Sequence, residues 1–143
     1  MKTLQPKKTD IKKSWHLFDA TDQILGRLST KVAGLLMGKG KSDYATQADM
    51  GDHVVILNAE KIKVTGRKGT QKMYRRHSGY PGGFKELSYD KMMVKNPERI
   101  LELAIGGMLP ENRLKKFRMA RLNVVKGSLN PFEKKFIKNV KES

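Results

Sequence analysis

The chain has 143 residues and no cysteine, and 30 Lys and Arg against 14 Asp and Glu give it a formal net charge of +16. This length suits one domain with a modest core, and the missing cysteines exclude disulfides, zinc fingers and thiol catalysis. A charge this high opposes compaction and favours a polyanionic partner, either nucleic acid or an acidic membrane surface.

The N-terminal stretch MKTLQPKKTDIKKSW contains lysines but no apolar run of the kind found in a secretory signal. No other run approaches the roughly 18 apolar residues of a membrane-spanning helix. We therefore expect a soluble, intracellular protein without a membrane partner.

The first half of the chain predicts a βαβ unit. SWHLFDA, residues 14–20, has the pattern of a short buried strand, and Thr21 or Asp22 can cap a helix that Gly38 ends. HVVIL, residues 53–57, has the β-branched composition of a strand covered on both faces. Two strands joined through a helix should run parallel, with a right-handed connection.

The second half predicts a last short strand, residues 122–125, and two helices, and the alternation of residues 61–65 fits either another strand or a strand-like extension. The first helix starts at Asn96 and Pro97, a good cap and first position. The second spans residues 112–121 and is basic and amphipathic. On this helix we expect Leu114, Phe117 and Ala120 to point inward, and Arg113, Lys116, Arg118 and Arg121 to surround them.

Charge is segregated along the chain. Residues 1–13, 61–85 and 111–143 carry net charges of +4, +8 and +7, whereas residues 14–60 and 86–110 carry −2 and −1. Mixed signs would serve solubility better than three separate basic runs. We therefore expect a basic N-terminal tail (1–13), a single α/β domain (14–127) with a basic loop (66–86), and a basic C-terminal extension (128–143).

No nucleotide-binding motif has the required spacing. In GKGKS, residues 38–42, five residues instead of four separate Gly34 from Gly40, and the run leaves a helix instead of entering one. A phosphate-binding loop is therefore not expected. We interpret this stretch as a helix end closed by glycine, with exposed lysines after it.

Catalytic and metal-binding patterns are equally weak. The three histidines are far apart in sequence, and His16 and His53 are expected to be structural. Turn chemistry accounts for Asp49 and Asp52 on either side of Gly51. We expect no enzymatic activity, no cofactor and no metal site.

The stretch KMYRRHSGYPGGFKE, residues 72–86, is the best candidate for a binding surface, because it has no carboxylate before its last residue. Arginine binds phosphate oxygens in a bidentate manner, and aromatic rings such as those of Tyr74, Tyr80 and Phe84 can stack on unpaired RNA bases. A hairpin whose aromatics pack on their own domain is the alternative. This alternative stays open for Tyr74 and Phe84. It is less favoured for Tyr80, because this residue lies between glycines.

Several separated motifs then make a family resemblance specific. HSGYPGG (77–83) resembles the signature of the bacterial-type ribosomal protein L13 family of the large subunit. DAT (19–21), LGRLST (25–30) and LLMGKGK (35–41) resemble its first helix and the exit from that helix. GDHVVILNAEKIKVTG (51–66) and GGMLPEN (106–112) match further family segments in the right order.

The resemblance implies a three-layer α/β/α fold with a mostly parallel four-stranded sheet. It also implies a non-catalytic structural role in the large ribosomal subunit, in the cytoplasm, with binding to its ribosomal RNA early in assembly and beside other ribosomal proteins. Combining the resemblance with the basic segments, we expect these residues to bind RNA: Lys39, Lys41, Arg67, Lys68, Lys72, Arg75, Arg76, His77, Ser78, Gly79, Tyr80, Gly82, Lys85, Arg113, Lys115, Lys116, Arg118 and Arg121.

Two other classes stay open at this point. The βαβ unit alone would allow a nucleotide-binding enzyme, and the charge alone would allow an architectural DNA-binding protein. Binding to its own messenger RNA would be a possible second role for a ribosomal protein.

Overall fold

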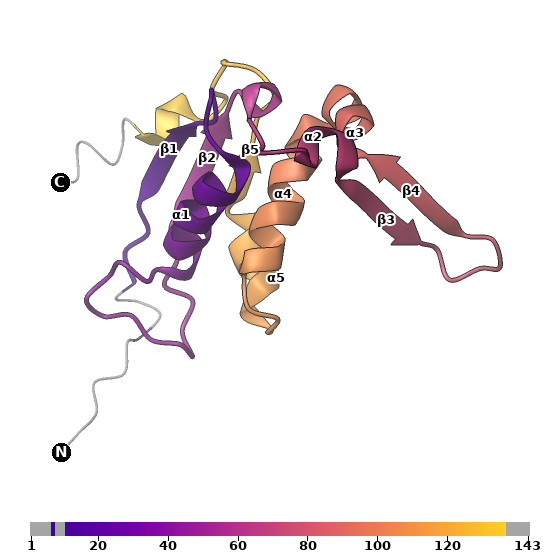
Figure 1. The fold of residues 1–143 in the computed structure, drawn as a ribbon. Helices are drawn as coiled ribbons and strands as arrows, with labels where there is room; N and C mark the ends of the chain where they lie inside the picture. Colours follow the sequence, from indigo (N-terminus) through magenta and orange to yellow (C-terminus); the bar gives the residue numbers. More distant parts are fainter. Residues whose placement is uncertain (1–6, 8–10, 137–143) are drawn as a thin grey trace.

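The computed structural model describes residue 7 and residues 11–136, shown as a ribbon in Figure 1. Most of the predicted tail (1–13) and the end of the predicted C-terminal extension (137–143) lie outside these described residues. None of the described helices is long and apolar enough to cross a membrane.

A parallel sheet forms the centre of the fold. Its strands β1 (Trp15–Asp19), β2 (His53–Leu57) and β5 (Leu122–Val124) lie in the order β1-β2-β5. The pairing is in register from Trp15 opposite His53 to Asp19 opposite Leu57. The predicted α/β class and the parallel βαβ unit are therefore confirmed.

The expected four-stranded sheet is wrong, because this sheet has three strands. Residues 61–65 form the strand-like extension and not a fourth strand: the segment begins in a 3-10 helix, η1 (Ala59–Lys61), after Asn58 in the left-handed region at φ 56°. Its backbone then pairs with the entry to the first helix: the Lys63 amide donates to the Gln23 carbonyl at 2.9 Å, and the Leu25 amide donates to the Lys63 carbonyl at 2.9 Å. The segment is extended but lies outside the sheet.

Helices α1 (Leu25–Met37) and α4 (Pro97–Met108) pack on one another beside the sheet, with α5 (Leu114–Ala120) below them in Figure 1. Alternation along the strands places Phe18, Ile56 and Val124 on the face toward this core. The fully buried core side chains include Leu36, Val32, Val54, Ile56, Ile100, Leu101 and Ile105. The helices predicted from Asn96 and from residue 112 are thus confirmed.

The predicted cap of α1 is wrong, although its end at Gly38 is confirmed. Ile24 occupies the cap position without a side-chain hydrogen bond, and Asp22 has a left-handed φ of 58°. The Thr21 hydroxyl donates instead to Asp19 at 2.7 Å. The pairing of this segment with Lys63 replaces a side-chain cap.

The opposite face of the sheet is covered only in part within the described residues. The Trp15 ring stacks on His53, with centroids 4.3 Å apart, and contacts Phe132 and Phe136. A helical turn at residues 133–136 is all that the described chain offers as a third layer. Leu17 is 50% exposed, so β1 is an edge strand and not the buried strand predicted.

A β-hairpin extends from the body (Figure 1), formed by β3 (Met73–His77) and β4 (Phe84–Ser88). Two short helices, α2 (Lys68–Gln71) and α3 (Tyr89–Lys95), lie at its base and pack on one another. At this base Tyr74 packs against the core, and the Tyr89 ring is buried in it. The acid-free stretch identified in the sequence is therefore a projecting arm.

The loop of residues 39–52 returns tightly against the end of α1, and two glycines make this possible. Gly38 has φ +78°, and a Cβ there would lie 2.7 Å from the Met50 carbonyl oxygen. A Cβ on Gly51 would lie 1.8 Å from the Leu36 carbonyl oxygen, a distance that no rearrangement of a side chain can relieve.

We predict that Gly51→Ala lowers the free energy of unfolding by more than about 2 kcal/mol, because the added methyl group must push the loop away from α1. Gly40→Ala in the same loop is the matched control: nothing lies within 4 Å of its Cβ position. The control should change stability by less than about 1 kcal/mol. Urea unfolding of both variants measures this, and equal stabilities would contradict the close approach.

Candidate nucleic-acid interface

Asp52 binds three groups at the start of β1 and the end of α1. It accepts the Ser14 amide at 3.0 Å and the Lys41 ammonium at 2.6 Å, and His16 Nε2 lies 2.9 Å from its second oxygen. The interpretation of Asp52 as a turn residue is therefore wrong, whereas the structural role predicted for His16 is confirmed. Burial alone would raise the pKa of Asp52, but the hydrogen bonds from Lys41, Ser14 and His16 outweigh it and lower this pKa.

Lys41 has no donor left for a partner. Its ammonium group donates to the carbonyls of Lys12 at 2.7 Å and Met50 at 2.9 Å as well as to Asp52, which uses its three N–H groups. Although the sequence pointed to Lys41 as an RNA-binding residue, the structure places it inside the protein's own scaffold. Lys39, two residues earlier, is exposed.

Asp49, also read as a turn residue, instead binds Arg121. Both terminal guanidinium nitrogens of Arg121 contact the two Asp49 oxygens, and one of them also donates to the Leu36 carbonyl at 3.3 Å. Arg121 is only 5% exposed. Burial opposes ionisation of Asp49, but the hydrogen bonds and the charge of Arg121, with Lys13 and Arg118 further away, lower its pKa.

The face of α5 that was predicted to point inward is also wrong. Phe117 is 59% exposed and Ala120 is exposed, whereas Arg118 is 1% exposed. Arg113 and Lys116 do lie on the surface, and Lys115 pairs with Glu111 one turn away. The spacing of apolar residues could not predict this orientation of α5. The helix packs against the loop that carries Asp49, and Arg118 and Arg121 face that loop.

The hairpin carries its charges on two faces, because neighbouring residues of a strand point to opposite sides. Arg75 lies opposite Glu86, and its Nε donates to that carboxylate at 2.8 Å. Arg76, on the other face, lies opposite Lys85, so that two cations face one another without a carboxylate between them. Such a pair is unfavourable unless an anion joins it.

The tip of the hairpin is an exposed turn built by glycines. Gly79 and Gly82 have φ +89° and +71°, and the Gly79 amide donates to His77 Nδ1 at 2.9 Å. Tyr80 at the tip is 77% exposed and Phe84 is 55% exposed. Among the three aromatics of this stretch, only Tyr74 packs on its own domain.

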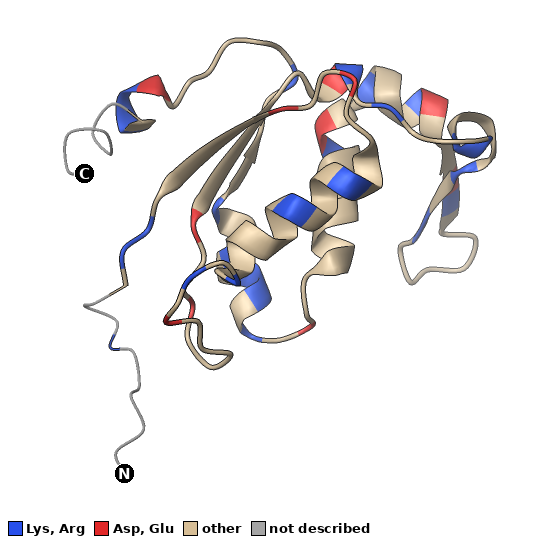
Figure 2. Ribbon diagram, turned by 60° about the vertical axis from the view of Figure 1, so that its left-hand side comes forward, with Lys and Arg blue, Asp and Glu red and all other residues tan. Residues whose placement is uncertain are grey.

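The expected RNA-binding residues thus fall into separate groups. The exposed hairpin residues form one group, and Lys39, Arg113 and Lys116 lie near the ends of α1 and α5. Arg118 and Arg121 are buried, and Lys41 is half-buried with its donors used within the protein. Figure 2 shows basic positions along the hairpin and on the helices of the body. Arg27, which no sequence pattern singled out, joins Lys68 and Lys72 around a groove beside α1.

Among the described residues, no three His, Asp or Glu side chains are placed to hold a metal ion.

We predict that Asp52→Asn lowers the free energy of unfolding at pH 7 by about 1–3 kcal/mol, since it weakens the charged hydrogen bonds of Lys41 and His16. A carboxyl whose pKa is lowered by folding stabilises the protein above its unfolded pKa and loses this effect as the pH falls through the folded value. Stability of the unmodified protein should therefore fall from about pH 5 downward, and less steeply in Asp52→Asn. Urea titrations between pH 7 and pH 2 measure both slopes.

Asp43→Asn is the control, because Asp43 is exposed and contacts only the hydroxyl of Ser42. It should retain the slope of the unmodified protein. Parallel curves for Asp52→Asn and the unmodified protein would show that Asp52 contributes nothing to the pH dependence.

An α/β domain whose projecting arm exposes basic and aromatic residues is typical of a nucleic-acid-binding protein of structural type. Residues 13–131 match the family model described as Ribosomal protein L13. The chain belongs to the ribosomal protein L13 family, as its sequence motifs suggested.

Curated relatives agree with the family match. The chain is 47% identical over 131 residues to the large ribosomal subunit protein uL13 of Hahella chejuensis, with 92% of each chain covered. It is 48% identical to that of Streptomyces griseus, covering 92% of this chain and 89% of the relative. It is 51% identical over 132 residues to that of Bifidobacterium adolescentis, covering 92% and 88%.

Proposed function

We infer that this protein is a structural, non-catalytic constituent of the large ribosomal subunit and that it binds the RNA of that subunit. The observation that carries this function is the family match over residues 13–131, with relatives of about the same length that are large-subunit proteins. The protein therefore works in translation, within cytoplasmic ribosomes. The exposed basic surface described above supplies the physical means.

The hairpin is proposed as the principal RNA contact. Arg76 and Lys85 face one another across the strands, and an RNA phosphate between them would remove their repulsion. Tyr80 and Phe84 expose rings on which unpaired bases can stack. Arg75 is already paired with Glu86 and is expected to contribute less than Arg76.

A second contact is proposed at Lys39, Arg113 and Lys116, together with the exposed ring of Phe117 between the basic residues of α5. Arg67, Lys68 and Lys72 extend the basic surface from the base of the hairpin. Lys41 and Arg121 support these contacts indirectly, since they hold the loop and α5 in place through Asp52 and Asp49.

The remaining elements of the proposal concern assembly. The basic N-terminal tail (1–13) and C-terminal extension (128–143) are proposed to contact RNA at the margins of the domain (14–127), beside other large-subunit proteins. An early role in assembly is proposed from the resemblance to the family, and neutralisation of RNA phosphates by these basic segments would be its physical basis. Its own messenger RNA, if bound, would use the same surface and compete with ribosomal RNA.

We predict that Arg75→Ala with Arg76→Ala weakens incorporation into large-subunit particles more than Lys2→Ala with Lys7→Ala. Both changes remove two positive charges, so the pair in the tail controls for net charge. Of the single variants, Arg76→Ala should have the larger effect, because Glu86 already occupies Arg75. Reconstitution with ribosomal RNA, followed by mass spectrometry of the particles, measures incorporation. Equal losses for both double variants would refute the role of the hairpin.

We also predict a steep dependence of RNA affinity on salt. If about eight phosphates are contacted, the affinity for a large-subunit RNA fragment should fall roughly 10³- to 10⁵-fold between 50 and 200 mM salt. Arg76→Ala should make this dependence shallower by about one counterion. Filter binding over a salt series gives the slope, and a nearly flat dependence would exclude binding through phosphates.

A further inference from the structure

Arg118 is a buried cation without a counter-ion. Its residue is 1% exposed, its Nε has no hydrogen-bond partner, and no carboxylate of the described residues forms an ion pair with it. Asp49 is close enough for Arg118 to contribute to its lowered pKa, but both Asp49 oxygens are bound by Arg121. Burying a guanidinium group costs free energy that a partner normally offsets. An anionic partner can reach Arg118 from the cavity that this residue lines.

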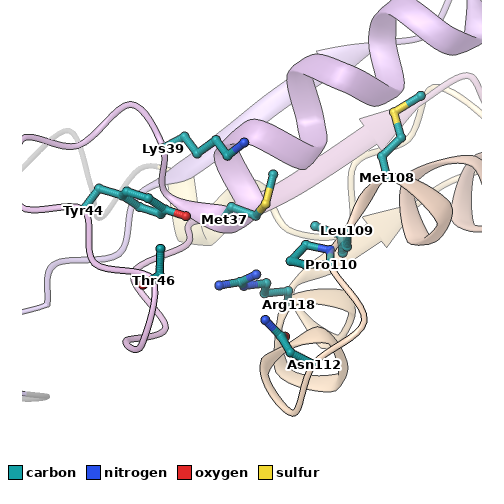
Figure 3. A pocket seen from close by; sticks show the side chains of 9 residues that line it. All are labelled: Met37, Lys39, Tyr44, Thr46, Met108, Leu109, Pro110, Asn112 and Arg118. Carbon is teal, nitrogen blue, oxygen red and sulfur yellow. The ribbon is translucent and has the colours of Figure 1, made fainter.

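This cavity of about 430 Å³ lies between the end of α1, the loop of residues 39–52 and α5. Figure 3 shows the side chains of Tyr44, from the loop, and Arg118, from α5, directed toward the same space, with Lys39 of the same loop along its edge. Asn112 also lines it, and because its carbonyl oxygen accepts the Leu114 amide at 3.1 Å, its NH₂ group is left to donate. The polar wall of the cavity thus offers hydrogen-bond donors and contains no carboxylate. Such a wall is suited to binding an anion.

The remaining wall is apolar, and an inorganic anion would leave it unfilled. Met37, Met108, Leu109 and Pro110 line this part of the cavity. Methionine side chains adapt to flat rings and contact them favourably through sulfur. The volume lies within the range of about 300–1,000 Å³ usual for small-molecule sites. A ligand with a phosphate and an adjoining planar ring matches both parts.

We propose that this cavity binds one unpaired nucleotide of the bound RNA, with a phosphate at Arg118 and Lys39 and the base against Met37, Leu109 and Pro110. The proposal rests on the RNA-binding function given above and adds a specific site to it. RNA supplies such nucleotides in loops and bulges, where bases are free to turn outward. The exposed cations Arg113 and Lys116 on α5 can guide the neighbouring backbone to the opening.

The test uses the full-length protein labelled with ¹³C at its methionine methyl groups, because Met37 reports from the cavity wall. Met108 lines both this cavity and the groove beside α1, so its signal is not specific to the cavity. Adenosine monophosphate, inorganic phosphate and a large-subunit RNA fragment are added in separate NMR titrations. We expect the mononucleotide and the RNA to shift the Met37 methyl signal, and phosphate alone to bind more weakly than the mononucleotide. Arg118→Met should weaken mononucleotide binding about tenfold or more, as expected for loss of a charged hydrogen-bond donor.

Variants at the rim keep the test decisive if Arg118→Met does not fold. Lys39→Met removes an exposed cation and should weaken mononucleotide binding several-fold, and Asn112→Ala should act in the same direction. Lys91→Met, which removes an exposed lysine of α3, is the control and should leave binding unchanged. Equal affinity of Lys39→Met and Lys91→Met for the mononucleotide would overturn the assignment of the phosphate position.

The outcomes also separate this site from the general function. RNA that binds without shifting the Met37 signal would overturn the cavity proposal and leave the RNA-binding function intact. Failure of the unmodified protein to bind RNA at all would contradict the function itself. Shifts caused by the mononucleotide but not by RNA would mean that the cavity takes a free nucleotide, and equal binding of phosphate would mean a simple anion site. Either result would overturn the proposal as stated.

Discussion

The positions of Asp49 and Asp52 are the constraint on which the rest of this structure depends. In a chain with a net charge of +16, two carboxylates of one loop bind Arg121, Lys41 and His16. These contacts join the start of β1, the end of α1 and the end of α5, which are distant in sequence. Removing one partner of such a buried pair leaves the other charge uncompensated, which costs more than the pair contributes. Gly51, between the two acids, lets the loop approach the end of α1 closely enough for both carboxylates to make these contacts.

A consequence is that the exposed basic surface stays without counter-ions of its own. The carboxylates of the loop are used internally, and the hairpin carries one acid, Glu86, which pairs with Arg75. Arg76, Lys85, Arg113 and Lys116 therefore face solvent without an acidic partner among the described residues. The division explains how a strongly basic chain can fold and yet remain complementary to RNA: internal acids stabilise the scaffold, and RNA phosphates neutralise the outside.

The sequence predicted those features that depend on local pattern. β2, α1 with its glycine end, the helix from Pro97 and the parallel βαβ arrangement follow from hydrophobic spacing and from helix-end residues, and the motifs identified the family. The sequence left residues 61–65 open between a strand and a strand-like extension, because alternation alone cannot distinguish a sheet strand from an extended segment that pairs with a helix entry. The predicted inward face of α5 is wrong because hydrophobicity assigns Phe117 to the core. The acid that draws Arg121 inward, Asp49, lies 72 residues earlier in a loop.

The same limit applies to the candidate interface. Composition located the hairpin, since eight basic residues without an acid are visible in residues 61–85. It could not separate Arg75 from Arg76, because their roles differ only through the residues across the hairpin, Glu86 and Lys85. Nor could it show that Lys41 is bound internally while Lys39 is exposed. These distinctions depend on tertiary contacts, which the order of residues does not display.

Sedimentation of a cell lysate through a sucrose gradient tests the central claim most directly, with the protein followed by antibody before and after ribonuclease treatment. The account predicts that the protein migrates with large subunits and intact ribosomes, and that digestion of the RNA releases it. A slowly sedimenting peak that ribonuclease does not change would contradict a role as an RNA-bound constituent of the large subunit.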